Sequence, residues 1–267
     1  MTSSSQYSSA ALRVVFLASG SRGNVTAVCS ADDVILIDAG ISARETRHRL
    51  AASDIDESLV RAVLLTHEHT DHVAGVRVLA RSLGVPVIGT EGTLRGAGTA
   101  LADVAEVCRI DADAESRLGC WSIRAFPTSH DAAQPVGYVL RHACGTSFGL
   151  ASDTGQLDDA ALEALAGCTL VGLESNHDVE MLRNGPYPRF LRERILSARG
   201  HLSNDDAASA LRYLLEHGTR HVCALHLSQQ NNTAAIARAT LEGEVAELGA
   251  SMRIDVARQL NPVICEL

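Results

Sequence analysis

The chain has 267 residues, 46% of them hydrophobic but only 3% aromatic, so its core must be built mainly from aliphatic side chains. Its formal net charge is −9 and all 23 basic residues are arginine, which argues against a protein that grips nucleic acid over its whole surface. Because no apolar run approaches the roughly 18 residues of a membrane span and residues 1–11 lack the pattern of a signal peptide, we predict a cytoplasmic protein without membrane association.

Short apolar runs rich in β-branched residues alternate with amphipathic stretches along the chain. The apolar runs predict buried strands at 14–18, 34–37, 62–65, 85–88, 123–126, 136–140, 147–151, 170–173, 222–225 and 253–256. Helical patterns cover 42–52, 73–83, 158–165, 203–216 and 233–248. Ser42 and Ser203 stand where N-caps are expected, and Asp206 takes the capping-box position after Ser203.

The mixture of strands and helices predicts an α/β fold. Residues 1–11 are interpreted as a disordered tail, and no linker, repeat or low-complexity tract follows them, so we predict one domain over residues 12–267. Two sheets covered by helices on the outside is the economical arrangement, although composition alone does not separate it from a single doubly wound sheet. The seven cysteines lack C-x-x-C spacing and are interpreted as free thiols of a reducing compartment.

Four potential metal ligands stand within six residues in the stretch 64–75, where a predicted strand runs into a polar loop and then a helix. Alternate residues of an extended chain point the same way, so His67 and His69 can bind one cation from one side. Asp71 and His72 lie at the turn into the helix and face a neighbouring position. Imidazole and carboxylate ligands without thiolate suit Zn²⁺, Mn²⁺ or Fe. The zincin pattern H-E-x-x-H is excluded, because Asp71 occupies the position of its second histidine.

The pattern His67-x-His69-x-Asp71-His72 after an apolar strand resembles the signature of the metallo-β-lactamase superfamily. Four other residues resemble the remaining motifs of that family, in its order: Asp38, His130, Asp153 and His226. The resemblance implies a four-layer αβ/βα sandwich with two mixed β-sheets flanked by helices, and a site for two divalent metal ions. It implies that His67, His69 and His130 hold one ion, that Asp71, His72 and His226 hold the other, that Asp153 lies between them, and that Asp38 supports the ligand loop.

Four stretches, 19–24, 174–182, 197–204 and 227–232, closely resemble the YycJ/WalJ family within this superfamily. The resemblance spans roughly residues 13–258. That family consists of bacterial metal-dependent nucleases, described as 5′-to-3′ exonucleases on double-stranded DNA, so it implies double-stranded DNA as the substrate. His177 matches the family pattern, and we assign it a supporting role behind the ligands, with helix capping by its neighbours as the alternative.

Two of these stretches also resemble ribonuclease Z, in which a glutamate after a strand and a Gly-His-Ser/Thr motif supply an acid and a proton-donating histidine. Glu174 and His201 occupy those places, although Leu202 intervenes between His201 and Ser203. The resemblance therefore implies that both assist the leaving group. Asp71 is the candidate to orient or deprotonate the attacking water while it also binds metal.

Candidate substrate contacts come from two regions. Backbone and side-chain donors of the 19–24 loop could hold a phosphate oxygen, which points to Ser19, Ser21 and Asn24, with a plain surface turn as the alternative. The stretch 178–200 contains five arginines and three acidic residues. Arg183 and Arg189 are the candidate phosphate contacts. A solvated helix face explains the same arginines equally well. No aromatic platform for base stacking is visible in the sequence.

Two other functions use the same residues. A small-molecule metallohydrolase would act on a lactone, a thioester or a small phosphodiester at the same dinuclear site, because one fold hosts many chemistries. A metal-binding protein recruited by partners would not hydrolyse anything.

Overall fold

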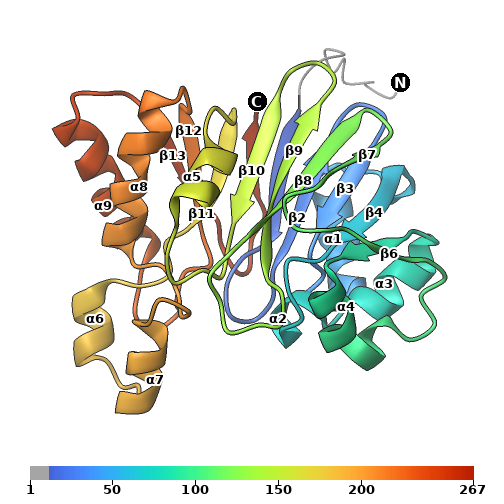
Figure 1. Cartoon of the computed structure of the whole chain (residues 1–267), viewed down its shortest axis with the longest axis horizontal. Helices are drawn as coiled ribbons and strands as arrows, with labels where there is room; N and C mark the ends of the chain where they lie inside the picture. The colour runs from blue at the N-terminus through green and yellow to red at the C-terminus, as the bar shows by residue number, and fades with distance from the viewer. Residues whose placement is uncertain (1–11) are drawn as a thin grey trace.

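The computed structural model describes residues 12–267, which form two seven-stranded mixed β-sheets packed face to face (Figure 1). The strands of the first sheet are, in spatial order, β14 (Val263–Glu266), β1 (Arg13–Ala18), β2 (Val25–Cys29), β3 (Val34–Ile37), β4 (Val60–Leu64), β5 (Val87–Gly89) and β6 (Val107–Arg109). The second sheet has the order β13 (Arg253–Val256), β12 (His221–Leu225), β11 (Leu170–Glu174), β10 (Ser147–Ala151), β9 (Val136–His142), β8 (Trp121–Pro127) and β7 (Glu115–Leu118).

Helices cover the outer face of each sheet, which gives four layers (Figure 1). The helices packed near the first sheet are α1 (Ala43–Ala52), α2 (Thr70–Val73), α3 (Val76–Leu83) and α4 (Glu91–Ala97). The second sheet is covered by α5 (Asp159–Leu165), α8 (Asn204–Glu216) and α9 (Ala234–Glu247). Two further short helices, α6 (Val179–Asn184) and α7 (Arg189–Ile195), project from the body at its lower end in Figure 1. The predicted αβ/βα sandwich is therefore confirmed.

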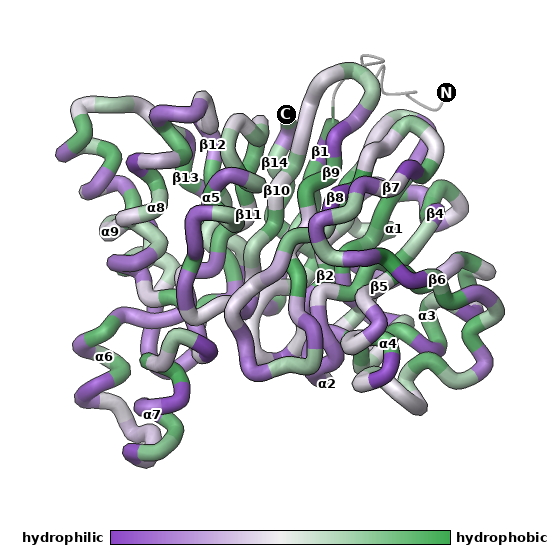
Figure 2. Tube along the Cα trace, viewed as in Figure 1, coloured by the Kyte–Doolittle hydropathy of each residue, from purple (hydrophilic) through white to green (hydrophobic). Residues whose placement is uncertain are grey.

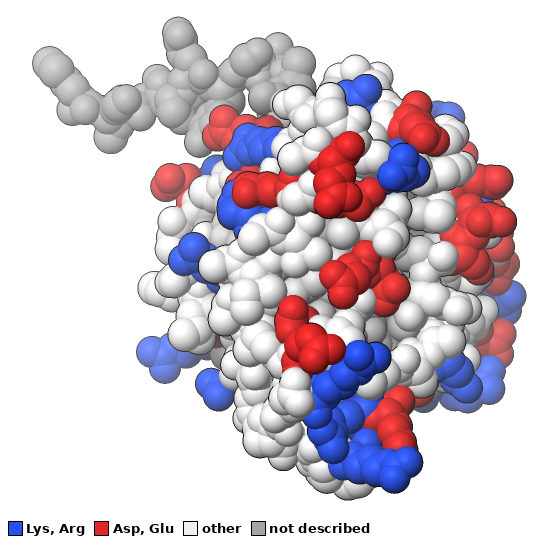
Figure 3. Space-filling model, turned by 90° about the vertical axis from the view of Figure 1, so that its left-hand side faces the viewer, with Lys and Arg blue, Asp and Glu red and all other residues white. Residues whose placement is uncertain are grey.

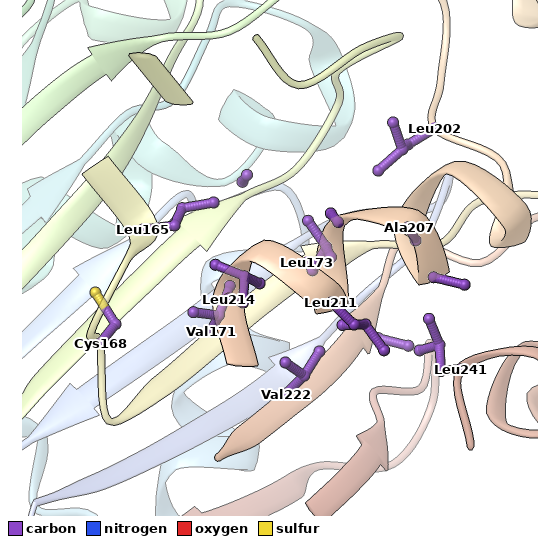
Figure 4. Close-up of a cluster of buried hydrophobic side chains, with 14 of the residues drawn as sticks. Leu165, Cys168, Val171, Leu173, Leu202, Ala207, Leu211, Leu214, Val222 and Leu241 are labelled. Carbon is purple, nitrogen blue, oxygen red and sulfur yellow. The ribbon is translucent and has the colours of Figure 1, made fainter. Parts of the chain in front are cut away.

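Three apolar clusters hold the layers together. Phe16, Tyr138 and Phe148 belong to the cluster between the two sheets, where the rings of Phe16 and Phe148 meet edge to face at 6.0 Å. The interior strands accordingly appear hydrophobic along the tube in Figure 2. Leu211 of α8 and Val171 of β11 belong to the cluster under the helices of the second sheet (Figure 4). This burial fixes the position of every strand end, and the site is built on those ends.

One half of each sheet is parallel, and these halves position the loops that carry function. Strands β3 to β6 run parallel to one another, as do strands β10 to β13. The carboxyl ends of parallel strands meet at one edge of a sheet, where side chains of successive loops converge. The loops after β3, β4, β10, β11 and β12 therefore meet below the two sheets.

The structure differs from the sequence-based elements in two ways. The helix predicted over 73–83 is divided at Gly75 into α2 and α3. A Cβ at Gly75 would lie 2.0 Å from the carbonyl oxygen of Ile41, so this glycine admits the close approach of the loop after β3. Strands β2, β6, β7 and β14 and helix α4 have no counterpart among the predicted elements; β7, with its exposed sequence Glu-Ser-Arg-Leu, carries no apolar pattern. Helices α6 and α7 lie where a solvated helix face was one of the two explanations of the arginines.

The two predicted N-caps are confirmed. Ser42 caps α1 by accepting from the backbone N–H of Glu45, and Ser203 caps α8 by accepting from that of Asp206. Within residues 12–267, none of the helices combines the length and the apolar character needed to cross a bilayer. The tail assigned to residues 1–11 lies outside the described residues.

Candidate metal centre

The seven predicted metal ligands converge below the two sheets from five separate segments. His67 and His69 follow β4, Asp71 and His72 lie in α2, and His130 follows β8. Asp153 follows β10 and His226 follows β12. Their ligand atoms form two groups within which all atoms lie within 4.8 Å of one another: His67, His69 and His130, and Asp71, His72, Asp153 and His226. These are the groups that the family resemblance implies.

In the first group, hydrogen bonds fix which ring nitrogen faces the site. The Nδ1 atom of His130 lies 3.0 Å from the carbonyl oxygen of Gly200, so it donates there and leaves a lone pair on Nε2. The Nδ1 atom of His69 lies 3.3 Å from that Nε2. The Nε2 atom of His67 is buried without a hydrogen-bond partner. Two imidazole nitrogens of this group, Nε2 of His130 and Nε2 of His67, are therefore free to bind a metal beside His69.

In the second group, carboxylates anchor the histidines from behind. Asp38 Oδ2 accepts from Nδ1 of His72 at 2.8 Å, and Glu174 Oε1 accepts from Nδ1 of His226 at 2.9 Å. Each histidine consequently presents Nε2 to the site, and the Nε2 atom of His226 lies 3.5 Å from Oδ2 of Asp71. Carboxylates behind ligand histidines fix the tautomer and raise the basicity of the ligand nitrogen.

Asp153 lies between the two groups. Its Oδ2 atom lies 3.2 Å from Nε2 of His72, and its Oδ1 atom lies 4.0 Å from Nε2 of His130. Burial acts to raise the pKa of Asp153, but the neighbouring imidazoles of His226 and His72 outweigh it and hold the pKa well below the usual value. The charged carboxylate can therefore serve both groups.

The donor set fits divalent metal ions. Burial, together with the charge of His72, lowers the pKa of His67 well below the usual value, so this imidazole is neutral and keeps a lone pair for a metal. The Nε2 atoms of His67 and His226 are both buried and unpartnered among the described residues. An unsatisfied buried polar atom costs about 1–3 kcal/mol, and coordination to a cation would satisfy both. Imidazoles together with carboxylates and no thiolate are ligands that suit Zn²⁺, Mn²⁺ and Fe.

The backbone is strained at three of these residues. Asp38, Asp153 and His226 adopt the left-handed conformation, with φ of 61°, 54° and 52°. Non-glycine residues occupy this region only when the surrounding structure requires it, and such residues gather at functional sites. Each follows a central strand, so the turn of the chain at the strand end aims the side chain into the site.

Asp38 ties the ligand loop to β3. Its carboxylate accepts from the backbone N–H of Thr66 at 2.9 Å and from the Thr66 hydroxyl at 2.9 Å, in addition to His72. Gly40, two residues later, packs so closely that a Cβ there would lie 1.6 Å from the carbonyl oxygen of Asp71. The ligand loop is thus held by both side-chain and backbone contacts.

Glu174 and His201 form a hydrogen-bonded pair at the edge of the site. Oε1 of Glu174 lies 2.8 Å from Nδ1 of His201, so the Nε2 atom of this histidine is left for other partners. Burial acts to lower the pKa of His201, but the charge and hydrogen bond of Glu174 outweigh it and raise the pKa above the usual value. Glu174 therefore favours the protonated form of His201, which lines the same cavity as His69, Asp71 and Asp153.

The three polar residues predicted in the 19–24 loop have different surroundings. Ser21 lines the cavity. Ser19 accepts from the backbone N–H of His226 at 2.8 Å, and Asn24 lies with Nδ2 3.0 Å from Nε2 of His72. Ser19 and Asn24 are buried and hold the ligand segments in place, while Ser21 remains open to the cavity.

The other predicted residues lie farther from the ligands. His177 is buried, and both of its ring nitrogens lack a hydrogen-bond partner among the described residues. Arg183 of α6 and Arg189 of α7 are exposed, each paired with a glutamate of its own helix. Neither arginine lines the cavity.

The structure adds residues that the sequence did not single out. The cavity has a volume of about 310 Å³, and Tyr187, Leu191, Arg194 and Ile195 form one of its walls. Arg194 forms an ion pair of 2.6 Å with Asp131, whose position directly after His130 was the one signal available in the sequence. Three of these wall residues, Leu191, Arg194 and Ile195, belong to α7.

The chain resembles proteins of known family over most of its length. The model of the Beta-lactamase superfamily domain matches residues 34–227. An exodeoxyribonuclease YycJ from Bacillus anthracis is 35% identical over 235 residues, which cover 87% of this chain and 89% of the relative. An exodeoxyribonuclease WalJ from Streptococcus pneumoniae serotype 2 is 34% identical over 247 residues, 90% of each chain.

Solved structures show the same fold. The metallo-β-lactamase fold protein YhfI from Bacillus subtilis superposes with a TM-score of 0.73 at 17% identity, covering 96% of this chain and 100% of that one. The short form of human tRNase Z superposes with a TM-score of 0.64 at 14% identity, covering 94% and 98%. With the ligand groups in their expected places, the chain belongs to the metallo-β-lactamase superfamily and, within it, to the family of YycJ and WalJ.

Proposed function

We propose that this protein is a dinuclear metal-dependent phosphodiester hydrolase, a 5′-to-3′ exonuclease on double-stranded DNA that works in the cytoplasm. The observation that carries the proposal is the pairing of two ligand groups around Asp153 with the Glu174–His201 pair beside them. The names of the two curated relatives support DNA as the substrate.

In this proposal His67, His69 and His130 hold one divalent ion, Zn²⁺, Mn²⁺ or Fe, while Asp71, His72 and His226 hold the second and Asp153 serves both. Two such ions, when bound, would supply positive charge that stabilises the scissile phosphate and would lower the pKa of a nearby water toward about 7. Proton transfer and contact with the substrate are carried out by side chains of this protein.

Asp71 and His201 move the protons. Asp71 is partly exposed at the cavity and accepts the proton of the attacking water, whose oxygen forms the new bond to phosphorus. His201, kept protonated by Glu174, donates from Nε2 to the 3′ oxygen as the old P–O bond breaks. Ser21, Arg183 and Arg189 contact the phosphates of the substrate, while Ser19 and Asn24 assist through the loop that they hold.

A nuclease assay tests the proposal. Duplex DNA labelled at one 3′ end should be shortened from its 5′ ends in the presence of Mn²⁺ or Zn²⁺, and the His67→Ala variant should lose at least a thousandfold in rate. His48→Ala removes an exposed histidine far from the cavity and is the matched control. Intact DNA with every divalent ion would refute the nuclease function.

The His201→Ala variant separates proton donation by His201 from metal binding. We expect a drop in kcat of about 10²–10⁴-fold, the usual contribution of a positioned acid, with unchanged metal content, because His201 lies outside the six histidine and aspartate ligands proposed for the individual ions. Loss of bound metal in this variant would show that His201 acts as a ligand instead.

The cavity volume of about 310 Å³ favours a second candidate, a small-molecule hydrolase, because it lies at the lower end of the range for small-ligand sites. That function predicts turnover of a lactone, thioester or small phosphodiester that added DNA does not inhibit.

A further inference from the structure

Phe190 is the most exposed large hydrophobic residue of the described chain, with 72% of its surface open to solvent. It lies on the segment 179–196, which contains α6 and α7 and which we call the arm. The arm stands away from both sheets at the end of the molecule where the metal ligands lie (Figure 1). A single exposed aromatic is common on protein surfaces, so its surroundings decide its meaning.

One face of α7 is a wall of the catalytic cavity. Leu191, Arg194 and Ile195 line it with the three- and four-residue spacing of one helix face, and Tyr187 lines it from just before the helix. Phe190 precedes Arg194 by four residues, so the two side chains are neighbours on the helix surface. Phe190 therefore stands at the rim of the cavity, one row out from the residues that line it.

The arm is also anchored to the metal ligands. Arg194 pairs with Asp131 at 2.6 Å, and Asp131 Oδ1 lies 3.4 Å from Nε2 of the ligand His130. Arg199, just beyond the arm, donates to the carbonyl oxygen of His130 at 3.1 Å. The rim position of Phe190 is therefore fixed relative to the reacting atoms.

The arm carries a net positive charge, whereas the whole chain is negative. Residues 179–196 contain four arginines and two acids, a balance of +2 in a chain of −9. Figure 3 shows arginine gathered at the end of the molecule formed by α6 and α7. The side chains of Arg183 and Arg189 are 62% and 85% exposed. Positive charge beside an open aromatic face matches a polynucleotide strand, whose backbone is anionic and whose bases stack on aromatic rings.

We propose that the arm binds the end of the substrate strand, with the terminal base stacked on Phe190 and the backbone held by arginines of the arm. The inference rests on the proposed nuclease function. A base inside a duplex has both faces covered by its neighbours, whereas a terminal base offers one free face. The cavity volume of about 310 Å³ suits one nucleotide at a time, so the strand end is the part of the substrate that reaches the rim.

The test compares Phe190→Leu, which removes the aromatic face and keeps an apolar side chain, with Phe190→Tyr, which keeps both. Val78→Ala, at an exposed apolar residue of α3, is the matched control. On duplex DNA we expect Phe190→Leu to raise KM about tenfold, within the range measured at base–aromatic stacks, and Phe190→Tyr and Val78→Ala to stay within twofold. On a duplex whose 5′-terminal residue is abasic, wild type and Phe190→Leu should become equal.

Three outcomes would overturn the stacking role: no change in KM for Phe190→Leu, an equal loss on the normal and the abasic duplex, or a change of oligomeric state that places Phe190 against a second copy. Hydrolysis of bis(p-nitrophenyl) phosphate reports on the metal centre and should be unchanged in every variant. If wild type hydrolyses this compound but not DNA, the nuclease function fails separately. The role of the arm is then tested by fluorescence anisotropy, which measures the affinity of the protein for 3′-labelled oligonucleotides. Equal affinity for oligonucleotides with and without the terminal base would refute stacking on Phe190.

Discussion

At the scale of single residues, the site depends on side chains that bind no metal. Asp38 and Glu174 each accept from the Nδ1 atom of a ligand histidine, and the carbonyl of Gly200 does the same for His130. These acceptors decide which ring nitrogen carries the proton, and only the other nitrogen can bind a metal. In the proposed site, the strength of metal binding would therefore depend on residues one contact away from the ions.

Asp38→Asn tests this dependence. Asparagine tolerates the left-handed backbone at position 38, but an amide nitrogen in place of Oδ2 cannot accept from His72 Nδ1. The proton would then move to Nε2, and we expect metal affinity to fall about 10–100-fold, measured by competition with a chromogenic chelator. Asp103→Asn, which alters an exposed carboxylate paired with Arg77, is the control. Equal affinities of both variants would contradict the role assigned to Asp38.

His177 should make the fold sensitive to acid. Burial lowers its pKa from 6.5 to about 4, so between these values the unfolded chain binds a proton that the folded chain does not. The contribution of His177 to the free energy of unfolding is therefore full above pH 6.5. It falls by up to ~3 kcal/mol as the pH drops toward 4. Urea denaturation of chelator-treated protein at pH 7, 5 and 4 should show this loss in wild type and a smaller one in His177→Gln. An equal loss of unfolding free energy with falling pH in wild type and His177→Gln would argue against the lowered pKa of His177.

At the scale of elements, the carboxyl ends of the parallel strands do the positioning. The turns after β3, β10 and β12 each contain a residue of positive φ at a ligand or its support, namely Asp38, Asp153 and His226. The loop after β3 also packs directly on α2, since the backbone N–H of Ala39 donates to the carbonyl oxygen of His72 at 2.8 Å. The division of the predicted helix at Gly75 follows from the same close packing.

Gly40→Ala should disrupt this packing. The added Cβ would lie 1.6 Å from the carbonyl oxygen of Asp71 and 2.7 Å from the nitrogen of Asn24, both backbone atoms. We expect a loss of about 1–3 kcal/mol in the free energy of unfolding together with weaker metal binding, measured by urea denaturation and metal titration. Gly243→Ala, in the middle of α9 with open space around it, should instead stabilise by about 0.5–1 kcal/mol. Matching effects at the two positions would rule out the steric argument.

At the scale of the whole molecule, the proposed metal centre lies where residues of the two sheets meet. His67 and His72 come from segments that follow β4 of the first sheet, whereas His130, Asp153 and His226 follow strands of the second. Ions held by both sets would link the layers at the open edge of the sandwich, where the apolar core between the sheets ends. Metal binding should therefore contribute to global stability as well as to catalysis.

Removal of metal should lower the melting temperature. Ions present at about a thousand times their dissociation constant stabilise by about 4 kcal/mol, which corresponds to a shift of about 10 °C for a domain of this size. Calorimetry before and after dialysis against a chelator measures the shift. His48→Ala should show the full shift, whereas His226→Ala should show less than half of it. A chelator-insensitive melting temperature would contradict this link between the sheets.

The sequence by itself determined the chemistry of the site. The order and spacing of His67, His69, Asp71 and His72 give a ligand set of defined type, because alternation along a strand end is a local property of the chain. The remaining ligands, His130, Asp153 and His226, followed from family order, and the four-layer fold followed from the same resemblance. The strands with strong apolar runs were also predictable, since their signal lies in the residues themselves.

The tertiary structure alone decided what depends on contacts between distant segments. It brought Glu174 to both His201 and His226, turned Ser19 and Asn24 into supports of the predicted ligand segments, and placed α7 against the cavity. The helices α6 and α7 are short, so the sequence of 178–200 allowed a solvated helix face but did not fix the bounds of either helix. Their position is set by packing against loops far away in the sequence, which local patterns do not encode.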